Sequence, residues 1–170
     1  MKKSIRKFLL HVLKLFGVNI FTIKGRYRIL KTDSITGDVL FISDWIDNLV
    51  VNGTGTGINI IARILGNDNT YPLPITKAKI GTGTTPPTNA DTDIEAGGVT
   101  KNSVADQVVS GGVVTLSFFY TSAELPNGTY TEFAIFCVNQ LFARSIISPS
   151  YTKGTNEDTT IEYEITVSNT

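Results

Sequence analysis

The feature that most constrains this chain is a two-residue alternation of apolar and polar side chains, repeated in separate segments. The alternating segments are "NIFTIKGRYRILK", "VVTLSFFYT", "YTEFAIFCV", "LFARSIIS" and "TTIEYEITVS". Successive side chains of a β-strand point to opposite faces of a sheet, so this pattern is typical of strands with one buried face. Six to eight strands with turn residues between them predict a mainly β protein, an antiparallel β-sandwich, with a small barrel as the alternative.

The alternation also predicts the core. We expect the following side chains to be buried between two sheets: Phe118 or Phe119, Phe133, Ile135, Phe142 and Ile161. These positions are apolar, and within each strand they lie on the face that the alternation assigns to the interior.

One hairpin can be assigned a register. The runs "FCV" and "LFA" are separated only by Asn139-Gln140, which predicts a tight turn there. In that register Glu132 lies opposite Ile147, and Arg144 lies opposite Ile135. Glu132 and Arg144 are therefore expected to meet as diagonal neighbours or through a tertiary contact, not as a direct cross-strand pair.

Two helices are predicted beside the strands. The segment "GINIIARILG", residues 57–66, is expected to form a short internal helix with Ile58, Ile61, Ala62 and Leu65 on one face. The segment "KKSIRKFLLHVLKLF" has helical spacing of its apolar residues and ends at Gly17. The 170 residues suit a single domain, so we divide the chain into a basic amphipathic helix, residues 1–18, and a β-sandwich domain, residues 19–170.

Charge is distributed unevenly along the chain. Residues 1–32 carry nine of the 15 basic residues and none of the 15 acids. The remaining residues therefore hold six bases against 15 acids, a net charge of −9. A basic arm on an acidic body is a pattern that favours association.

The N-terminal helix is the candidate binding element. We predict that it is an assembly arm that contacts a partner through these residues: Ile5, Phe8, Leu9, Val12, Phe16, Lys3, Arg6 and Lys7. It is too short to span a membrane, and His11 and Lys14 interrupt the apolar stretch that a signal peptide needs. Contact with an anionic membrane surface or with nucleic acid phosphates is less favoured, because the apolar face is wide enough to require burial against protein. The sequence leaves open whether that protein is the domain of the same chain or a neighbour.

Two Gly-Thr segments raise the question of a phosphate site. "NGTGTGINIIARIL" precedes the predicted helix, and "KAKIGTGTTPPTNADTDI" follows a predicted strand. A Walker loop requires a lysine after its last glycine, where the first segment has Ile58, and the second offers prolines, which donate no N–H. We interpret both segments as connectors whose glycines permit positive φ.

Other chemistry is weakly indicated. The alternating acids Asp91, Asp93 and Glu95 could ligate calcium, but the rest of an EF-hand is missing, so a solvated loop is preferred. His11 is the only histidine, so no Ser-His-Asp triad can form. Cys137 lies in an apolar run and is expected to be a buried structural thiol. We therefore predict no catalytic site, no metal and no cofactor.

The order of motifs carries a resemblance. Residues 40–168 contain these segments: Asn48-Leu49, "GTGTTPP" from Gly81, Asp91-Thr92, "GTYTEFAIF" from Gly128, "LFAR" ending at Arg144, and Thr152–Val167. This order resembles that of tail and other virion structural proteins of bacteriophages. In the pattern a glycine usually stands where this chain has Ala134.

The resemblance implies a non-enzymatic structural component of a phage particle, located in the virion, with copies of itself and other virion proteins as partners. The alternative is a β-sandwich module that binds carbohydrate or a host surface. In that case Trp45, Tyr71 or Tyr120 would form exposed aromatic platforms.

Overall fold

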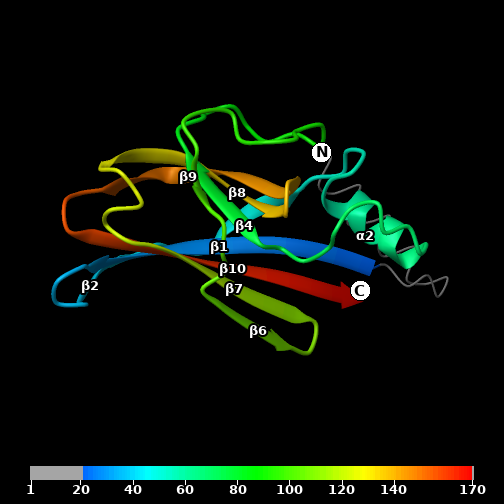
Figure 1. Ribbon diagram of the computed structural model, residues 1–170, viewed down its shortest axis with the longest axis horizontal. Coiled ribbons are helices and arrows are strands. Elements are labelled where there is room, and N and C mark those ends of the chain that lie inside the picture. Colours follow the sequence, from blue (N-terminus) through cyan, green and yellow to red (C-terminus); the bar gives the residue numbers. More distant parts are fainter. Residues whose placement is uncertain (1–20, 170) are drawn as a thin grey trace, which may run out of the picture.

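The computed structural model describes residues 21–169, which form ten β-strands and one helix (Figure 1). In chain order these are β1 (Phe21–Asp33), β2 (Val39–Ile42), β3 (Ile46–Val50), α2 (Gly57–Leu65), β4 (Lys77–Gly81), β5 (Val99–Lys101), β6 (Asp106–Ser110), β7 (Val113–Tyr120), β8 (Gly128–Cys137), β9 (Gln140–Lys153) and β10 (Glu157–Asn169). The predicted N-terminal helix, residues 1–18, lies outside the described residues.

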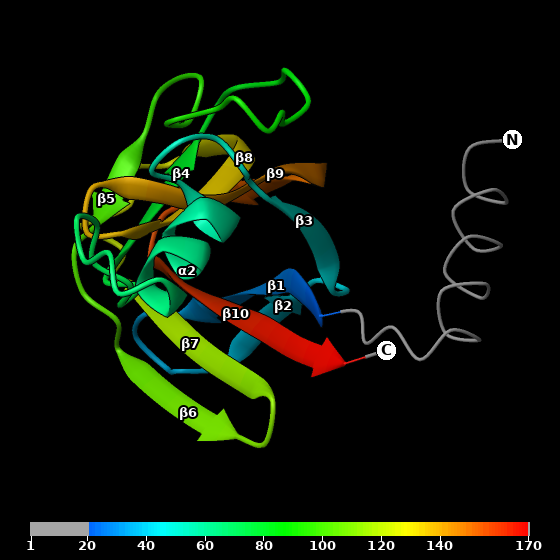
Figure 2. The ribbon, with the colours of Figure 1, turned by 90° about the vertical axis from the view of Figure 1, so that its right-hand side faces the viewer.

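All ten strands belong to one antiparallel sheet. The strand order is β5-β4-β8-β9-β3-β1-β10-β7-β6, and β2 pairs with β1 beside this path. The short strand β3 connects the two halves, because residues 46–48 pair with β1 while Leu49 and Val50 pair with β9. A mainly β, antiparallel fold with one short internal helix is confirmed. The strand pairing gives a single curled sheet and not the two separate sheets that were predicted (Figure 2).

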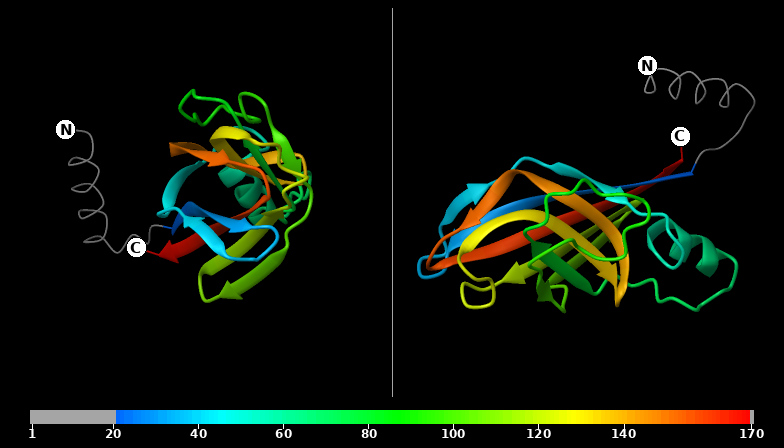
Figure 3. Two further views of the ribbon diagram at one scale, coloured as in Figure 1. Left: turned by 90° about the vertical axis from the view of Figure 1, so that its left-hand side faces the viewer. Right: turned by 90° about the horizontal axis from the view of Figure 1, so that it is seen from above.

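The curl brings β8 and β9 over β1 and β10, and the core lies between them (Figures 2 and 3). The ring of Phe133 on β8 lies 4.8 Å from that of Tyr27 on β1 and 6.3 Å from that of Tyr163 on β10, measured between centroids. The predicted core is confirmed at Phe118, Phe133, Ile135, Phe142 and Ile161, each at most 2% exposed. Phe119 is the member of its pair on the other face.

The ladder between β1 and β10, the longest in the sheet, pairs basic residues near the N-terminus with acidic residues near the C-terminus. Over thirteen residues β1 pairs with β10, which places bases of β1 beside acids of β10. Three ion pairs cross it: Arg26–Glu164 (2.8 Å), Arg28–Glu162 (2.5 Å) and Lys31–Glu157 (3.0 Å). Part of the basic arm inferred from the sequence is therefore the partner of an acidic strand. With the four bases of β1 included, residues 21–169 hold ten bases against 15 acids, a net charge of −5, whereas residues 33–170 alone carry −9.

The β8–β9 hairpin turns one residue earlier than predicted. Cys137 pairs with Gln140, so the two-residue turn is Val138-Asn139. Val138 has φ of 57°, a left-handed conformation that β-branched residues seldom adopt. The predicted turn at Asn139-Gln140 is therefore wrong, because a valine is not expected in a left-handed turn position from its residue type.

The helix α2 packs at one end of the curled sheet beside β9 (Figure 1). Its buried face is centred on Ile60, which is fully buried, with Ile61 and Ile64 packed against the core. Of the face that was predicted, Ile58 and Leu65 are exposed. Isoleucine and leucine occur around most of this short helix, so periodicity alone did not determine which side meets the core.

Candidate functional site

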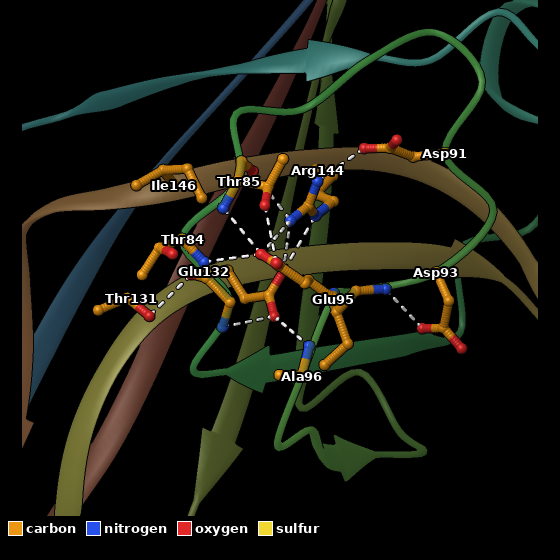
Figure 4. Close-up of polar contacts among 12 residues, drawn as sticks. Thr84, Thr85, Asp91, Asp93, Glu95, Ala96, Thr131, Glu132, Arg144 and Ile146 are labelled. Atoms are coloured by element: carbon orange, nitrogen blue, oxygen red, sulfur yellow. Dashed lines mark hydrogen bonds and ion pairs between the residues drawn. The ribbon is translucent and has the colours of Figure 1, made fainter.

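The site with the most polar contacts lies on the outer face of β8 and β9, away from the core. There the loop of residues 82–98, which joins β4 to β5, folds over Glu132 and Arg144 (Figure 4). Glu132 has no solvent exposure and Arg144 has 3%. Because buried charges require partners, the contacts of these two side chains define the site.

The carboxylate of Glu132 is fully hydrogen-bonded. Its Oε1 accepts the N–H groups of Gly83 (2.8 Å) and Ala96 (2.9 Å). Its Oε2 accepts the N–H of Glu95 (2.9 Å) and the Nε–H of Arg144 (3.0 Å). Two oxygens with four donors use the whole acceptor capacity of a carboxylate. Glu132 therefore ties both ends of the loop to β8.

The guanidinium of Arg144 joins the loop to β9. Besides its bond to Glu132, it donates from Nη1 to Asp91 Oδ2 (2.7 Å) and from Nη2 to the carbonyl of Thr85 (3.1 Å). Glu95 lies 3.8 Å from Nη2. A guanidinium has five donors in a rigid fork and stays charged, which suits it to three acceptors set around one plane.

Two of the three acids of the loop, Asp91 and Glu95, have lowered pKa values. The backbone N–H of Thr85, its hydroxyl group and the N–H of Thr84 lower the pKa of Glu95. Burial acts to raise the pKa of Asp91, but hydrogen bonds from Thr88 and the charge of Arg144 outweigh it and the pKa is lowered. One cation is thus surrounded by three carboxylates, and backbone N–H groups supply the remaining compensation.

The glycines of "GTGTTPP" are explained by close approach. A Cβ on Gly83 would lie 2.3 Å from Glu132 Oε1, and one on Gly81 would lie 2.4 Å from the carbonyl oxygen of Ala96. Neither glycine has positive φ. The interpretation of this segment as a connector holds. Gly83 is required by contact with the buried carboxylate of Glu132, and Gly81 by contact with the carbonyl of Ala96, and neither by the left-handed conformation that we predicted.

The first Gly-Thr segment is closed by protein contacts. The N–H of Ile58 donates to the carbonyl of Val51 (3.0 Å), and the next two N–H groups of α2 donate to the carbonyl of Thr56. A Cβ on Gly57 would lie 2.0 Å from the same Val51 oxygen. The N–H groups at the start of the helix are therefore not available to a phosphate.

The three alternating acids of the loop do not converge on one point where a metal ion could bind. Asp91 and Glu95 turn toward Arg144, while Asp93 pairs with Lys79 (2.6 Å). Within residues 21–169 no group of three or more potential ligands is arranged to hold a metal ion. Cys137 is buried as predicted; its thiol donates to the carbonyl of Leu73, and burial raises its pKa to about 12.

The three candidate aromatic platforms lie in different surroundings. Tyr120 is fully buried in the core, so its proposed role as an exposed platform is wrong. The guanidinium groups of Arg26 and Arg28 lie 4.6 and 4.9 Å from the ring centroid of Trp45, which is half-buried. Tyr71 lies against Arg63. Aromatic residues on alternating strands cannot be assigned to surface or core without the register.

The predicted contact between Glu132 and Arg144 is confirmed as a diagonal one. Glu132 lies opposite Ile146, and Arg144 lies opposite Ala134. The earlier turn changes the register from the predicted one, and an irregularity between Ile135 and Phe136 partly offsets this change. The sequence did not reveal that Asp91 and Glu95 join them, since the loop has no periodicity. The predicted partner-binding residues of the N-terminal segment lie outside the described residues.

Comparison of the chain with protein-family models, with curated proteins and with solved structures found no match. In the described part of the chain no helix is long and apolar enough to cross a membrane. The site itself is closed: the charged groups of Glu132 and Arg144 contact residues of the same chain. What this arrangement does chemically is hold a loop in one conformation.

Proposed function

We propose that this chain is a structural component of a tailed bacteriophage particle, acting by self-association and by contacts with neighbouring virion proteins. The observation that carries the proposal is the convergence of the motifs on which the resemblance rests. Gly83, Asp91, Glu132 and Arg144 belong to four separate motifs and contact one another in one cluster. Short motifs that are unrelated to one another are not expected to lie together in the fold, whereas motifs that encode one structural unit are expected to be in contact.

A rigid loop suits an assembly role. The contacts of Glu132 and Arg144 hold residues 82–98 in place before any partner arrives. The loss of conformational entropy then occurs during folding and does not oppose association. Because Pro86 and Thr88 are exposed, this loop would offer a neighbouring subunit a surface of fixed shape.

An exposed apolar strand is the candidate surface for self-association. β2 pairs only with β1, and all four of its side chains, Val39, Leu40, Phe41 and Ile42, are 43–57% exposed. An unpaired strand edge that carries apolar side chains is an association surface in many proteins. A second copy of the chain is the simplest partner, since most soluble oligomers are built from identical subunits.

Sedimentation velocity of the purified protein tests this proposal. The double variant Leu40→Ser/Phe41→Ser should shift the oligomer toward monomer. The control Val108→Ser/Val109→Ser alters two equally exposed residues of β6 and should leave the oligomer intact. An unaltered protein that is monomeric at every concentration would contradict self-association. Dissociation by the control alone would move the contact from β2 to β6.

A second candidate function, carbohydrate or host-surface binding, is favoured by one cleft. A cavity of about 460 Å³ beside β2 and β3 is lined by Phe41, Trp45 and Asp44, together with Ser148 and Ser150 of β9. Aromatic rings with hydroxyl and carboxylate groups are suited to sugars. Quenching of the fluorescence of Trp45 by saccharides, abolished in Phe41→Ala but retained in Tyr71→Ala, would support this function over the first.

A further inference from the structure

An apolar groove lies at the end of the curled sheet where β1 begins and β10 ends. Its volume is about 460 Å³, and Gln107 is the one polar residue among those that line it. The lining includes Phe21, Ile23, Leu73, Val114, Phe142 and Val167. α2 contributes Ile61 to one wall and lies at the same end of the molecule (Figures 1 and 2).

The groove is a continuation of the core face that the other half of the sheet does not cover. Along β1 the inward-facing side chains pass from Tyr27, which is fully buried, through half-buried Ile23 to Phe21, which is 60% exposed. Along β10 the same change occurs between Ile165, which is buried, and half-buried Val167. An apolar surface of this kind is stabilised when another apolar surface covers it.

The chain itself supplies a segment suited to this groove. Phe21, the first described residue, lines the groove. Residues 17–20 can span at most about 14 Å, so the preceding segment begins close by. That segment carries an apolar stripe at helical spacing: Ile5, Phe8, Leu9, Val12 and Phe16. A connection of four residues makes the encounter intramolecular and raises the effective concentration of the segment at the groove.

We propose that the groove binds residues 4–16 of the same chain, with the apolar stripe facing the groove. The segment is then a part of the domain that closes the core, and Lys3, Arg6 and Lys7 face solvent. The sequence left open whether this segment packs on its own domain or on a neighbour, and the proposal selects the first, in place of the assembly arm that was predicted. The proposal does not depend on a virion function, because it concerns contacts within one chain.

Limited trypsin digestion of the full chain tests this binding, because a segment bound in the groove is protected from cleavage after Lys14. The groove variant Phe21→Gln/Leu73→Gln makes two exposed lining residues polar and should leave the fold intact by circular dichroism. Its cleavage after Lys14 should be about tenfold faster, because proteolysis follows the population of the open form. The control Ile58→Gln/Leu65→Gln alters two exposed residues of α2 outside the groove and should be cleaved at the unaltered rate.

Repeating the digestion at lower protein concentrations shows whether the segment in the groove comes from the same chain or from a second copy. Protection that is independent of protein concentration supports the proposal. Protection that is lost on dilution would overturn it and assign the groove to the segment of a neighbouring copy. Equal cleavage rates for the groove variant and the unaltered protein would also overturn it, because the segment would then not use the groove.

Discussion

Replacing Arg144 with methionine tests the idea that one buried cation holds the loop of residues 82–98. Methionine keeps most of the aliphatic stem and removes the guanidinium. The side chain of Arg144 is 4% exposed, and that of Glu132 is fully buried, so the variant leaves a buried carboxylate without its cation. The hydrogen bonds to Glu132, Asp91 and the carbonyl of Thr85 are lost together.

The expected cost follows from this burial. Breaking a buried ion pair by removing one partner lowers the free energy of unfolding by about 3–5 kcal/mol. A matched control is Arg63→Met, since Arg63 pairs with Asp68 at the surface, with side chains 32% and 39% exposed. Exposed pairs contribute about 0–1 kcal/mol. The two variants remove the same group, so the difference between them isolates the effect of burial.

Urea denaturation followed by the fluorescence of Trp45, the only tryptophan, measures both free energies of unfolding. The double variant Arg144→Met/Glu132→Gln completes a mutant cycle. It removes the uncompensated carboxylate, so its loss should be smaller than the sum of the single losses by about 0.5–3 kcal/mol. If Arg144→Met costs no more than Arg63→Met, or if the cycle is additive, the cluster does not hold the fold as argued.

Three further predictions concern stability. Gly83→Ala should lower the free energy of unfolding in denaturation experiments, because its Cβ would lie 2.3 Å from a carboxylate oxygen of Glu132. The control Gly128→Ala should be tolerated, because no atom lies within 4 Å of the added Cβ. Equal losses of unfolding free energy in the two variants would contradict the close-approach argument. Phe133→Ala should lower the free energy of unfolding by about 3–5 kcal/mol, and a loss below about 1 kcal/mol would mean that the core is misassigned. The pKa values of Asp91 and Glu95 are lowered in the folded protein, so the unfolded chain binds more protons in acid. The two carboxylates therefore stabilise the fold above the ordinary carboxyl pKa of about 4, and this stabilisation is lost as the pH falls below that value. A melting temperature of the unaltered protein that stays constant below this pH would refute the prediction.

Features that depend on local periodicity could be predicted from the sequence. Alternation identified the long strands and buried side chains such as Phe133 and Ile161, because burial of one face of a strand produces alternation directly. It did not identify the short strands β5 and β6, which lie in a polar stretch of the sequence. The predicted hairpin also placed Glu132 and Arg144 near each other, although its register separated them by three positions along the strand and the observed register separates them by two. That error arose because Val138 adopts a conformation stabilised by the hairpin as a whole and not by its own preference.

Features that depend on long-range pairing could not be predicted. The sheet is continuous because the five-residue strand β3 pairs with β1 at one end and with β9 at the other, and no pattern within β3 indicates two partners. The ends of the loop meet Glu132 through backbone N–H groups, which every residue except proline carries. Side-chain identity therefore gave little indication of where the loop would dock.

The virion proposal requires that the gene belong to a phage, and its most direct test is quantitative mass spectrometry of particles purified from that phage. The account predicts that the chain is present in several copies per particle, in a constant ratio to the major structural proteins, and that it remains after washing at high salt. Its absence from purified particles that are complete and infectious would contradict the account.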